Sequence, residues 1–482
     1  MQIKLFFLSI IYTLASENYK IKKIIYKNYF FMLISKSTLK SILIASFCSA
    51  VFNISAQDRY VAVSGTDIGD CSDPMNSCAS LAYAIGQSDP GDDIYISDGV
   101  YAVSVMVVVD KSVTVTGQSQ LNTILELQTG SNTLMEVTTG GVELNAFTLR
   151  VNPGHGDFAN TNLLNPYDNF LANHITFQGA GFDGVRSTGV RMNMMFENCS
   201  FIQNRNGFRV ASDASADEVT FNNCLFEGNT NLIGSGTFGI SNSNETVSSA
   251  KLSNLIVQGC EFINFTSAAA TNSGMYFENV DSIYINRNHF VNSQRGITFV
   301  KFNRGDPDNM ENIIIDSNLF ENNSAFGITM FSFTNHGYNN VSLSCNTFMN
   351  NEVGFRTGLS GGGDWVDFHI NNNNFLGNIS QGILMSNVLL NNQVIDATNN
   401  FWGSSNGPTH SSNPGGTGDV IGGAGSDDSI VFIPFLSRRA CVSETPIPAI
   451  GEWGLLILTL LILTVAIIGI KQNENIMGLE KN

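Results

Sequence analysis

The sequence predicts an all-β solenoid, a chain that winds into stacked coils of short strands. One phenylalanine recurs at intervals of 24 to 36 residues, and a repeat in this range is typical of solenoid architectures. Between these landmarks apolar and polar residues alternate with period two, as in "SIYIN" and "NIIID", which is the pattern of strands. The recurring residues are Phe177, Phe201, Phe226, Phe262, Phe290, Phe320, Phe348, Phe375 and Phe401.

The composition agrees with short strands joined by tight turns. The 482 residues include 57 Asn, 45 Gly and 34 Phe, and only 13% are charged. Asn and Gly tolerate the left-handed backbone angles of tight turns, whereas Phe favours strands. No repeat contains a ten-residue apolar stripe of period 3.6, so helical repeats are disfavoured.

The position two residues before each phenylalanine, from Phe201 onward, predicts an interior ladder. Equivalent residues of stacked coils lie about 4.8 Å apart. The rings would then form an interior stack, and amides at a tight turn would bond the next amide and so offset the cost of their burial. The ladder set is Cys199, Cys224, Cys260, Asn288, Asn318, Asn346, Asn373 and Asn399.

The repeated phrase N-x-F-x-x-N-x-x-G-I resembles the right-handed parallel β-helix repeat family, which has the pectin-lyase-like fold. The segment containing "SLAYAI" and "PGDDIYISDGVY" is similar to the N-terminal cap of bacterial surface β-helices, in which a short helix plugs the open end. The resemblance implies a single-stranded right-handed β-helix of about 12 coils. It places the cap at residues 57–93 and the β-helix at 94–440.

Residues 32–56 have the pattern of a secretory signal peptide. Lys36 and Lys40 precede an apolar run, and small residues precede the cleavage site expected after Ala56. Residues 1–31 fit no part of this pattern and form a doubtful N-terminal extension, consistent with an upstream start codon.

The C-terminal region predicts attachment to a membrane. Residues 453–470 carry no charge, which is about the minimum length for a spanning helix, and Trp453 lies at the edge as interfacial aromatic residues do. We divide the region into a linker with sorting motif at 441–452, a transmembrane helix at 453–471 and a short tail at 472–482.

"IPAIGEWG" and the apolar run after it resemble the IPTL-type C-terminal sorting signal of Gram-negative bacteria, with Pro448, Trp453 and Gly454 in the motif. The resemblance implies a membrane sorting or processing enzyme as a partner and a body exported to the cell surface. The family usually has a basic cluster where only Lys471 follows here, so retention of the tail as a plain anchor stays open.

The charge balance excludes some partners. The formal net charge is -17, and residues 57–444 contain 15 basic and 37 acidic residues. So acidic a body repels nucleic acid and anionic lipid, and it suits an extracellular surface or divalent cations. No metal-ligand spacing such as His-x-x-x-His occurs, so we predict no metal site or cofactor, with Ca²⁺ left open.

The cysteines fit an exported repeat protein. Cys71 and Cys78 bracket a seven-residue loop and are expected to form a disulfide. The three ladder cysteines are expected to be buried small side chains rather than metal ligands, and a bond between Cys199 and Cys224 stays open. No pairing is assigned to Cys345 or Cys441.

A small basic row is predicted on the outside of the coils. The residue two positions after each repeated glycine should point outward, and this set is Arg186, Arg209, Thr298, Thr329, Arg356 and Leu384. Arg186 and Arg209 would lie about one strand spacing apart, with Arg191, Arg205 and Asp183 nearby. These four arginines are candidate ligands for an acidic sugar, and Arg186 and Arg209 are candidate catalytic bases. The alternative is scattered surface arginines.

Trp365 is a further candidate, because its ring could stack on a sugar; alternatively it covers the core. Three functions remain: a non-enzymatic surface or matrix protein that binds glycans, a polysaccharide lyase acting on uronate-containing glycans, or a structural stalk. A lyase needs a strong base and a group that neutralises the uronate carboxylate, often Ca²⁺. A glycosidase needs two carboxylates across a groove.

Overall fold

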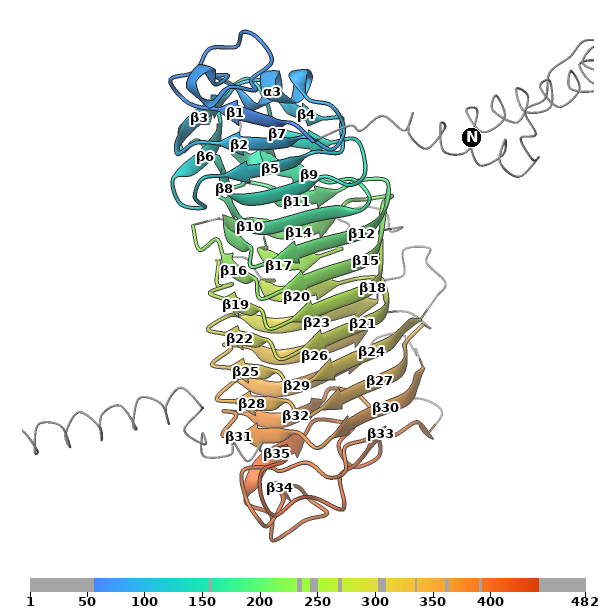
Figure 1. The fold of residues 1–482 in the computed structure, drawn as a ribbon. Coiled ribbons are helices and arrows are strands. Elements are labelled where there is room, and N and C mark those ends of the chain that lie inside the picture. The colour runs from blue at the N-terminus through green and yellow to red at the C-terminus, as the bar shows by residue number, and fades with distance from the viewer. Residues whose placement is uncertain are drawn as a thin grey trace, which may run out of the picture. The chain divides into compact units, whose positions relative to one another are not determined.

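The computed structural model describes residues 56–155, 158–231, 236–242, 250–267, 271–301, 309–333, 336–359, 364–389 and 392–441. These residues form a parallel β-solenoid in which each strand pairs with its equivalent one coil further on, so the predicted all-β solenoid is confirmed (Figure 1). The coiling is right-handed, as crossover connections between parallel strands almost always are.

The strands form two sheets. Within the described residues, sheet A has 23 strands in two rows, and sheet B has 13. The first row of sheet A contains β1 (Asp58–Val61), β2 (Asp93–Ile96), β5 (Thr114–Gly117), β8 (Glu143–Val151), β10 (Phe170–Gln178), β12 (Val190–Glu197), β15 (Ser215–Asn222), β18 (Lys251–Gln258), β21 (Val280–Asn286), β24 (Met310–Asp316), β27 (Tyr338–Ser344), β30 (Trp365–Asn371), β33 (Ile395–Asp396) and β36 (Ile430–Val431).

The second row of sheet A follows a bend in each coil and consists of shorter strands. It contains β3 (Gly99–Val103), β6 (Thr123–Leu127), β13 (Ser200–Asn204), β16 (Leu225–Gly228), β19 (Glu261–Ile263), β22 (His289–Val291), β25 (Leu319–Glu321), β28 (Thr347–Met349) and β31 (Asn374–Leu376). β8 and β10 run through both rows, because they pair with strands of each.

Sheet B closes each coil. It contains β4 (Val107–Val109), β7 (Thr133–Val137), β9 (Asn162–Asn165), β11 (Asp183–Ser187), β14 (Asn206–Val210), β17 (Phe238–Ser241), β20 (Ser273–Phe277), β23 (Arg295–Lys301), β26 (Phe326–Ser332), β29 (Val353–Leu359), β32 (Gln381–Met385), β34 (Pro408–Thr409) and β35 (Gly418–Gly422). The helices are α3 (Leu81–Gln87) and the 3-10 turns η2 (Pro74–Asn76) and η3 (Phe158–Asn160).

The abundance of Asn follows from the bends. In the coil of β24 and β25 the backbone φ is 57° at Asn312, 58° at Ser317 and 54° at Asn322, and the neighbouring coils repeat this left-handed geometry at equivalent positions. Only Gly, and next to it Asn and Asp, adopts this conformation at low cost. The sequence therefore places Asn at many of these left-handed positions.

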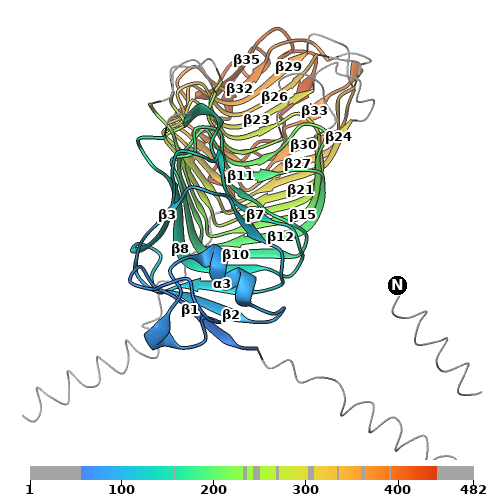
Figure 2. The same ribbon diagram turned by 90° about the horizontal axis from the view of Figure 1, so that it is seen from above.

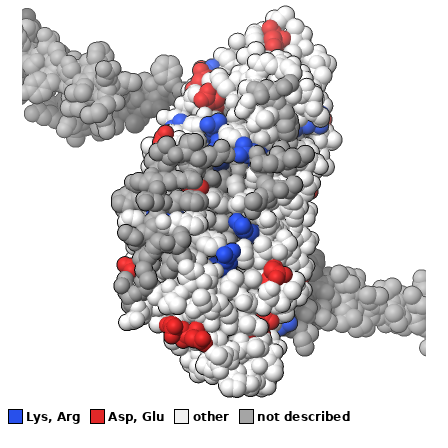
Figure 3. Space-filling model, turned by 180° about the vertical axis from the view of Figure 1, so that it is seen from behind, with Lys and Arg blue, Asp and Glu red and all other residues white. Residues whose placement is uncertain are grey.

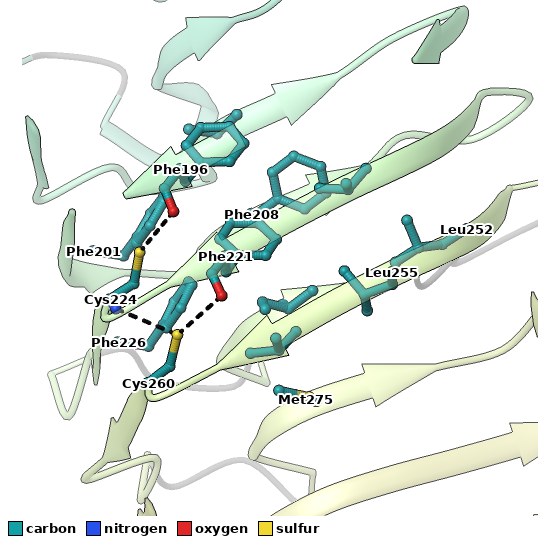
Figure 4. Packing of buried hydrophobic residues seen from close by; sticks show 14 of the residues in the cluster. Phe196, Phe201, Phe208, Phe221, Cys224, Phe226, Leu252, Leu255, Cys260 and Met275 are labelled. Atoms are coloured by element: carbon teal, nitrogen blue, oxygen red, sulfur yellow. Dashed lines mark hydrogen bonds between the residues drawn. The ribbon is translucent and has the colours of Figure 1, made fainter. Parts of the chain in front are cut away.

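An aromatic column fills the interior. Phe177, Phe201, Phe226, Phe262, Phe290, Phe320, Phe348, Phe375 and Trp402 stack with adjacent centroids 4.5–5.0 Å apart, which defines about nine turns. Figure 4 shows Phe201 and Phe226 of this column. A Cβ added at Gly296 would lie 2.7 Å from Cδ1 of Phe320 and 2.5 Å from the carbonyl oxygen of Gly327. The repeated glycine is therefore required for the strand of sheet B to approach the rings.

An asparagine ladder runs beside this column. Asn318, Asn346 and Asn373 each accept a bond at Oδ1 from the preceding ladder residue's backbone N–H and side-chain amide, at 2.8–3.0 Å. The prediction of Asn399 as the last member is wrong. Asn400 receives the bond from Asn373, while Asn399 occupies a left-handed corner with φ 58°. The register differs because Trp402, not Phe401, stacks on Phe375.

The three ladder cysteines replace amides at the same position. The backbone N–H of Cys224 donates to Sγ of Cys260, and Sγ of Cys224 and Sγ of Cys260 donate to the carbonyl oxygens of Phe196 and Phe221 (Figure 4). Cys199, Cys224 and Cys260 are free and buried. Burial raises the pKa of the thiols of Cys224 and Cys260 well above the ordinary value, so they stay protonated.

A second ladder, to which the sequence analysis assigned no role, runs through Asn323, Asn351 and Asn378. Its last amide donates to the carboxylate of Asp419, at Oδ2. Burial raises the pKa of Asp419 above its ordinary value, although the bonds from Asn378 and Gly377 oppose this shift. The repeat motif contained both asparagines, so the second ladder was visible in the pattern.

The two ends of the stack differ (Figures 1 and 2). At the N-terminal end α3 buries Leu81, Ala84 and Ile85, and Cys71 is disulfide-bonded to Cys78. β1 already pairs with β2, so the first coil begins within residues 57–93. At the C-terminal end residues 436–441 run back along the coils, and Cys441 is disulfide-bonded to Cys345.

The N-terminal extension, the signal peptide, the sorting motif and the transmembrane segment lie outside the described residues, and the expectation of 12 coils stays a prediction. Within the described part of the chain, no helix has both the length and the apolar character needed to cross a membrane.

Candidate functional site: an arginine-rich outer face of sheet B

The outer side of sheet B, here called the arginine face, carries two columns of side chains in register: one contains Arg186 and Arg209, and the other contains Arg295 and Phe326. Arg186 pairs with Arg209 on neighbouring strands, and Thr298, Thr329 and Arg356 continue the same column on β23, β26 and β29. Figure 3 shows several Lys and Arg side chains along the middle of this side of the molecule, between white and grey atoms, with most Asp and Glu away from that line. The face therefore has a cationic axis on an acidic protein.

The N-terminal part of this face is a cluster around Phe182. The guanidinium carbons of Arg186, Arg205 and Arg209 lie 5.5, 5.1 and 4.3 Å from the centre of its ring. Cation–π contacts of this kind hold guanidinium groups over a ring face. The sequence predicts Arg186, Arg191, Arg205 and Arg209 near Asp183, and the structure places Arg186 and Arg209 beside it, with Nε 3.9 and 2.9 Å from a carboxylate oxygen.

Arg209 does not present a free cation. Its Nε donates to both carboxylate oxygens of Asp183 at 2.9 and 3.0 Å, and its side chain is only 9% exposed. Asp183 is fully buried. Arg209, predicted as a candidate catalytic base, therefore has its Nε occupied by a buried ion pair, and its catalytic role stays a prediction.

Aromatic rings occupy the middle of the face. The rings of Phe238 on β17 and Tyr276 on β20 are in contact, with centroids 4.7 Å apart and planes inclined by 35°, and Phe238 is partly exposed. A ring exposed on a sheet offers a flat apolar surface beside polar neighbours. This pair separates the N-terminal cluster from a second group of arginines.

The second cluster surrounds Phe326. The guanidinium carbons of Arg295 and Arg356 lie 5.7 and 4.8 Å from its ring centre, and Arg356 also lies 4.5 Å from Phe331. Nε of Arg356 donates to Oγ of Ser386 at 3.2 Å. Nε of Arg295 is buried and has no partner in the described part of the chain.

Electrostatics distinguish the second cluster from the first. Among the described residues, neither Arg295 nor Arg356 forms an ion pair with a carboxylate. Burial lowers the pKa of both groups, and Arg356 lowers that of Arg295 further. Both remain charged, because an arginine pKa starts far above neutrality. Two partly desolvated cations side by side are costly unless an anion joins them.

Two other candidate residues lie elsewhere. Arg191 is on β12 of sheet A, where its guanidinium carbon lies 4.4 Å from the ring centre of Tyr167, so the structure does not bring it to the arginine face. Trp365 is 2% exposed and packs against Tyr338 and Phe368 inside the solenoid. The prediction that Trp365 could stack on a sugar is therefore wrong, and the alternative that it contributes to the core holds.

The arrangement suits anion binding better than acid–base catalysis. The one carboxylate at the centre of the first cluster, Asp183, is held by Arg209 and by Asn206. No group of three His, Cys, Asp or Glu side chains that could hold a metal ion occurs among the described residues. Planar guanidinium groups with free N–H donors match carboxylates in geometry and charge.

Comparisons with known proteins give little beyond the topology. No family model matches the chain, and no curated protein matches its sequence. Solved structures with a similar fold include pectin methylesterase PemA from Erwinia chrysanthemi (11% identity, 51% of this chain, 80% of that chain, TM-score 0.31). Others are the Dettilon tailspike protein (12%, 78%, 68%, TM-score 0.42) and pectate lyase Pel9A (15%, 67%, 80%, TM-score 0.32). At these values the likeness concerns the fold alone.

Proposed function

We propose that this chain is a cell-surface protein that binds an acidic, uronate-containing polysaccharide along the arginine face without cleaving it. The observation that carries the proposal is the cluster of Arg295 and Arg356 around Phe326, in which two partly buried cations have no carboxylate partner among the described residues.

A uronate unit would supply what this cluster lacks. Its carboxylate can accept charge-assisted hydrogen bonds from guanidinium N–H groups, which are shorter and stronger than neutral ones. Its ring can pack on the partly exposed rings of Phe326 and Phe331. Arg295 and Arg356 stand two coils apart, about 9.6 Å at the usual strand spacing, so a chain lying along the solenoid axis would meet both arginines.

A binding role is favoured over lysis because the cations are not placed as bases. Arg209 is committed to Asp183, and Arg356 donates to Ser386. A strongly basic guanidinium that stays protonated binds anions but removes no proton. We also propose that residues 32–56 direct export and that residues 453–471 anchor the chain in a membrane, at least until a processing enzyme acts. Both steps would present the arginine face to extracellular glycans.

Replacing both Arg295 and Arg356 with glutamine is expected to weaken binding of polygalacturonate at least tenfold, because each loses a charge-assisted hydrogen bond worth roughly 1.5–3 kcal/mol. Calorimetric titration of the full chain at two salt concentrations measures this, and wild-type affinity should fall as salt rises.

The matched control is Arg438→Gln with Arg439→Gln, which removes two exposed positive charges outside the face. This control should bind like the wild type. Equal affinity of the Arg295/Arg356 variant and wild type would refute the proposal. Appearance of unsaturated sugar ends, read by ultraviolet absorbance, would show lysis instead.

A further inference from the structure

A small pocket lies at the N-terminal end of the arginine face, beyond Arg186. Its volume is about 240 Å³, and its wall includes Glu136 of β7, Asn162 and Asn165 of β9, Arg186 of β11, Thr188 and Met106. Glu136 pairs with Asn165 on the neighbouring strand. The pocket therefore continues the column of side chains that contains Arg186.

One wall of the pocket is held rigidly. Nδ2 of Asn165 donates to Oε1 of Glu136 at 3.2 Å, and Oγ1 of Thr188 donates to Oδ1 of Asn165 at 3.1 Å. These two bonds fix the amide plane and the carboxylate. A preorganised polar wall lowers the entropy cost of binding a ligand.

Two residues that line this pocket each have a buried polar atom without a partner in the described part of the chain. Asn162 is 7% exposed, and its Oδ1 accepts no hydrogen bond from any residue that the structure describes. Nε of Arg186 is also buried and donates to none of them; the nearest carboxylate oxygen, on Asp183, is 3.9 Å away. Buried polar groups in native proteins are almost always paired, so an acceptor and a donor together indicate a ligand that supplies both.

We propose that this pocket binds one uncharged sugar unit, and that the glycan is therefore a mixed polymer of uronate and uncharged units. A sugar hydroxyl both donates and accepts, so hydroxyls can satisfy Oδ1 of Asn162 and Nε of Arg186 at once. The Glu136 carboxylate excludes a uronate by like-charge repulsion, and the thioether of Met106 offers an apolar contact. The inference rests on the proposed function. It assigns an uncharged sugar unit to the pocket at the N-terminal end of the arginine face, whereas the cluster of Arg295 and Arg356 binds a uronate.

The full chain is mixed with uncharged trisaccharides of glucose, galactose and N-acetylglucosamine, and separately with trigalacturonate. Saturation-transfer NMR detects binding of each probe, and titration measures its affinity. At least one uncharged trisaccharide is expected to bind, and Asn162→Leu is expected to weaken it at least tenfold. Binding should be unchanged in the Arg295/Arg356 double variant, because those side chains lie on other coils.

Glu136→Gln keeps the side chain's size and its bond from Asn165. It therefore tests the pocket independently if the Asn162→Leu variant fails to fold. In the Arg295/Arg356 background it is expected to raise trigalacturonate affinity at least tenfold. Failure of every uncharged probe to bind, or equal affinities in wild type and both pocket variants, would overturn the pocket assignment. Polygalacturonate binding that is lost in the Arg295/Arg356 variant would still support the proposed function in that case. The two outcomes therefore distinguish a wrong pocket assignment from a wrong proposed function.

Discussion

Phe320→Ala is expected to lower the free energy of unfolding by about 3–5 kcal/mol, the usual cost of deleting a fully buried ring. Phe320 is 0% exposed and stacks on Phe290 and Phe348 at 4.8 and 5.0 Å. The cavity cannot close easily, because the backbone of each coil is held by parallel pairing with its neighbours. Urea denaturation of the full chain measures the loss.

Phe333→Ala is the matched control, since this ring is 47% exposed at the end of β26. It should cost less than about 1 kcal/mol. If the two variants were equally stable, the aromatic column would not be the core of the fold.

Asn346→Ala is expected to destabilise the protein by about 2–6 kcal/mol. The substitution leaves the backbone N–H of Asn318 and the carbonyl oxygen of Ile315 without partners, and both lie inside the solenoid. Each unpaired buried group costs roughly 1–3 kcal/mol. Thermal and urea unfolding of the variant would measure the sum.

The control for the ladder is Asn339→Ala, on the outer side of β27, where the side chain makes one bond of 3.3 Å to Glu311. A surface change of this kind should stay within about 0.5 kcal/mol. A ladder variant as stable as this control would mean that the buried amides contribute no more than exposed ones.

The coil could be predicted from the sequence because stacked coils give equivalent positions the same surroundings, so the same residue types recur once per coil. A ring or amide buried in one coil must match the coil above it, so Phe320 and Asn318 recur with their surroundings. The error at Asn399 arose where "NNFW" offers two asparagines and two aromatic residues. Only packing decides between them, and Trp402 fits over Phe375.

The site was less predictable because the outer face does not repeat. The outward direction of Arg186 and Arg209 followed from the strand period, but the burial of Arg209 depends on Asp183 and Phe182 of the neighbouring coil. Arg295 was missed, although it directly precedes a repeated glycine, as Phe326 does on the next coil. Reading the residue before each glycine as outward would have found this second column.

An acidic glycan is expected to bind along the arginine face. Chemical modification of arginines in the full chain, read by mass spectrometry with and without polygalacturonate, tests it most directly. Modification of Arg295 and Arg356 should slow with polygalacturonate but not with uncharged dextran, while that of the exposed Arg438 and Arg439 should not change. Equal modification of Arg295 and Arg356 with and without the polymer would contradict the account.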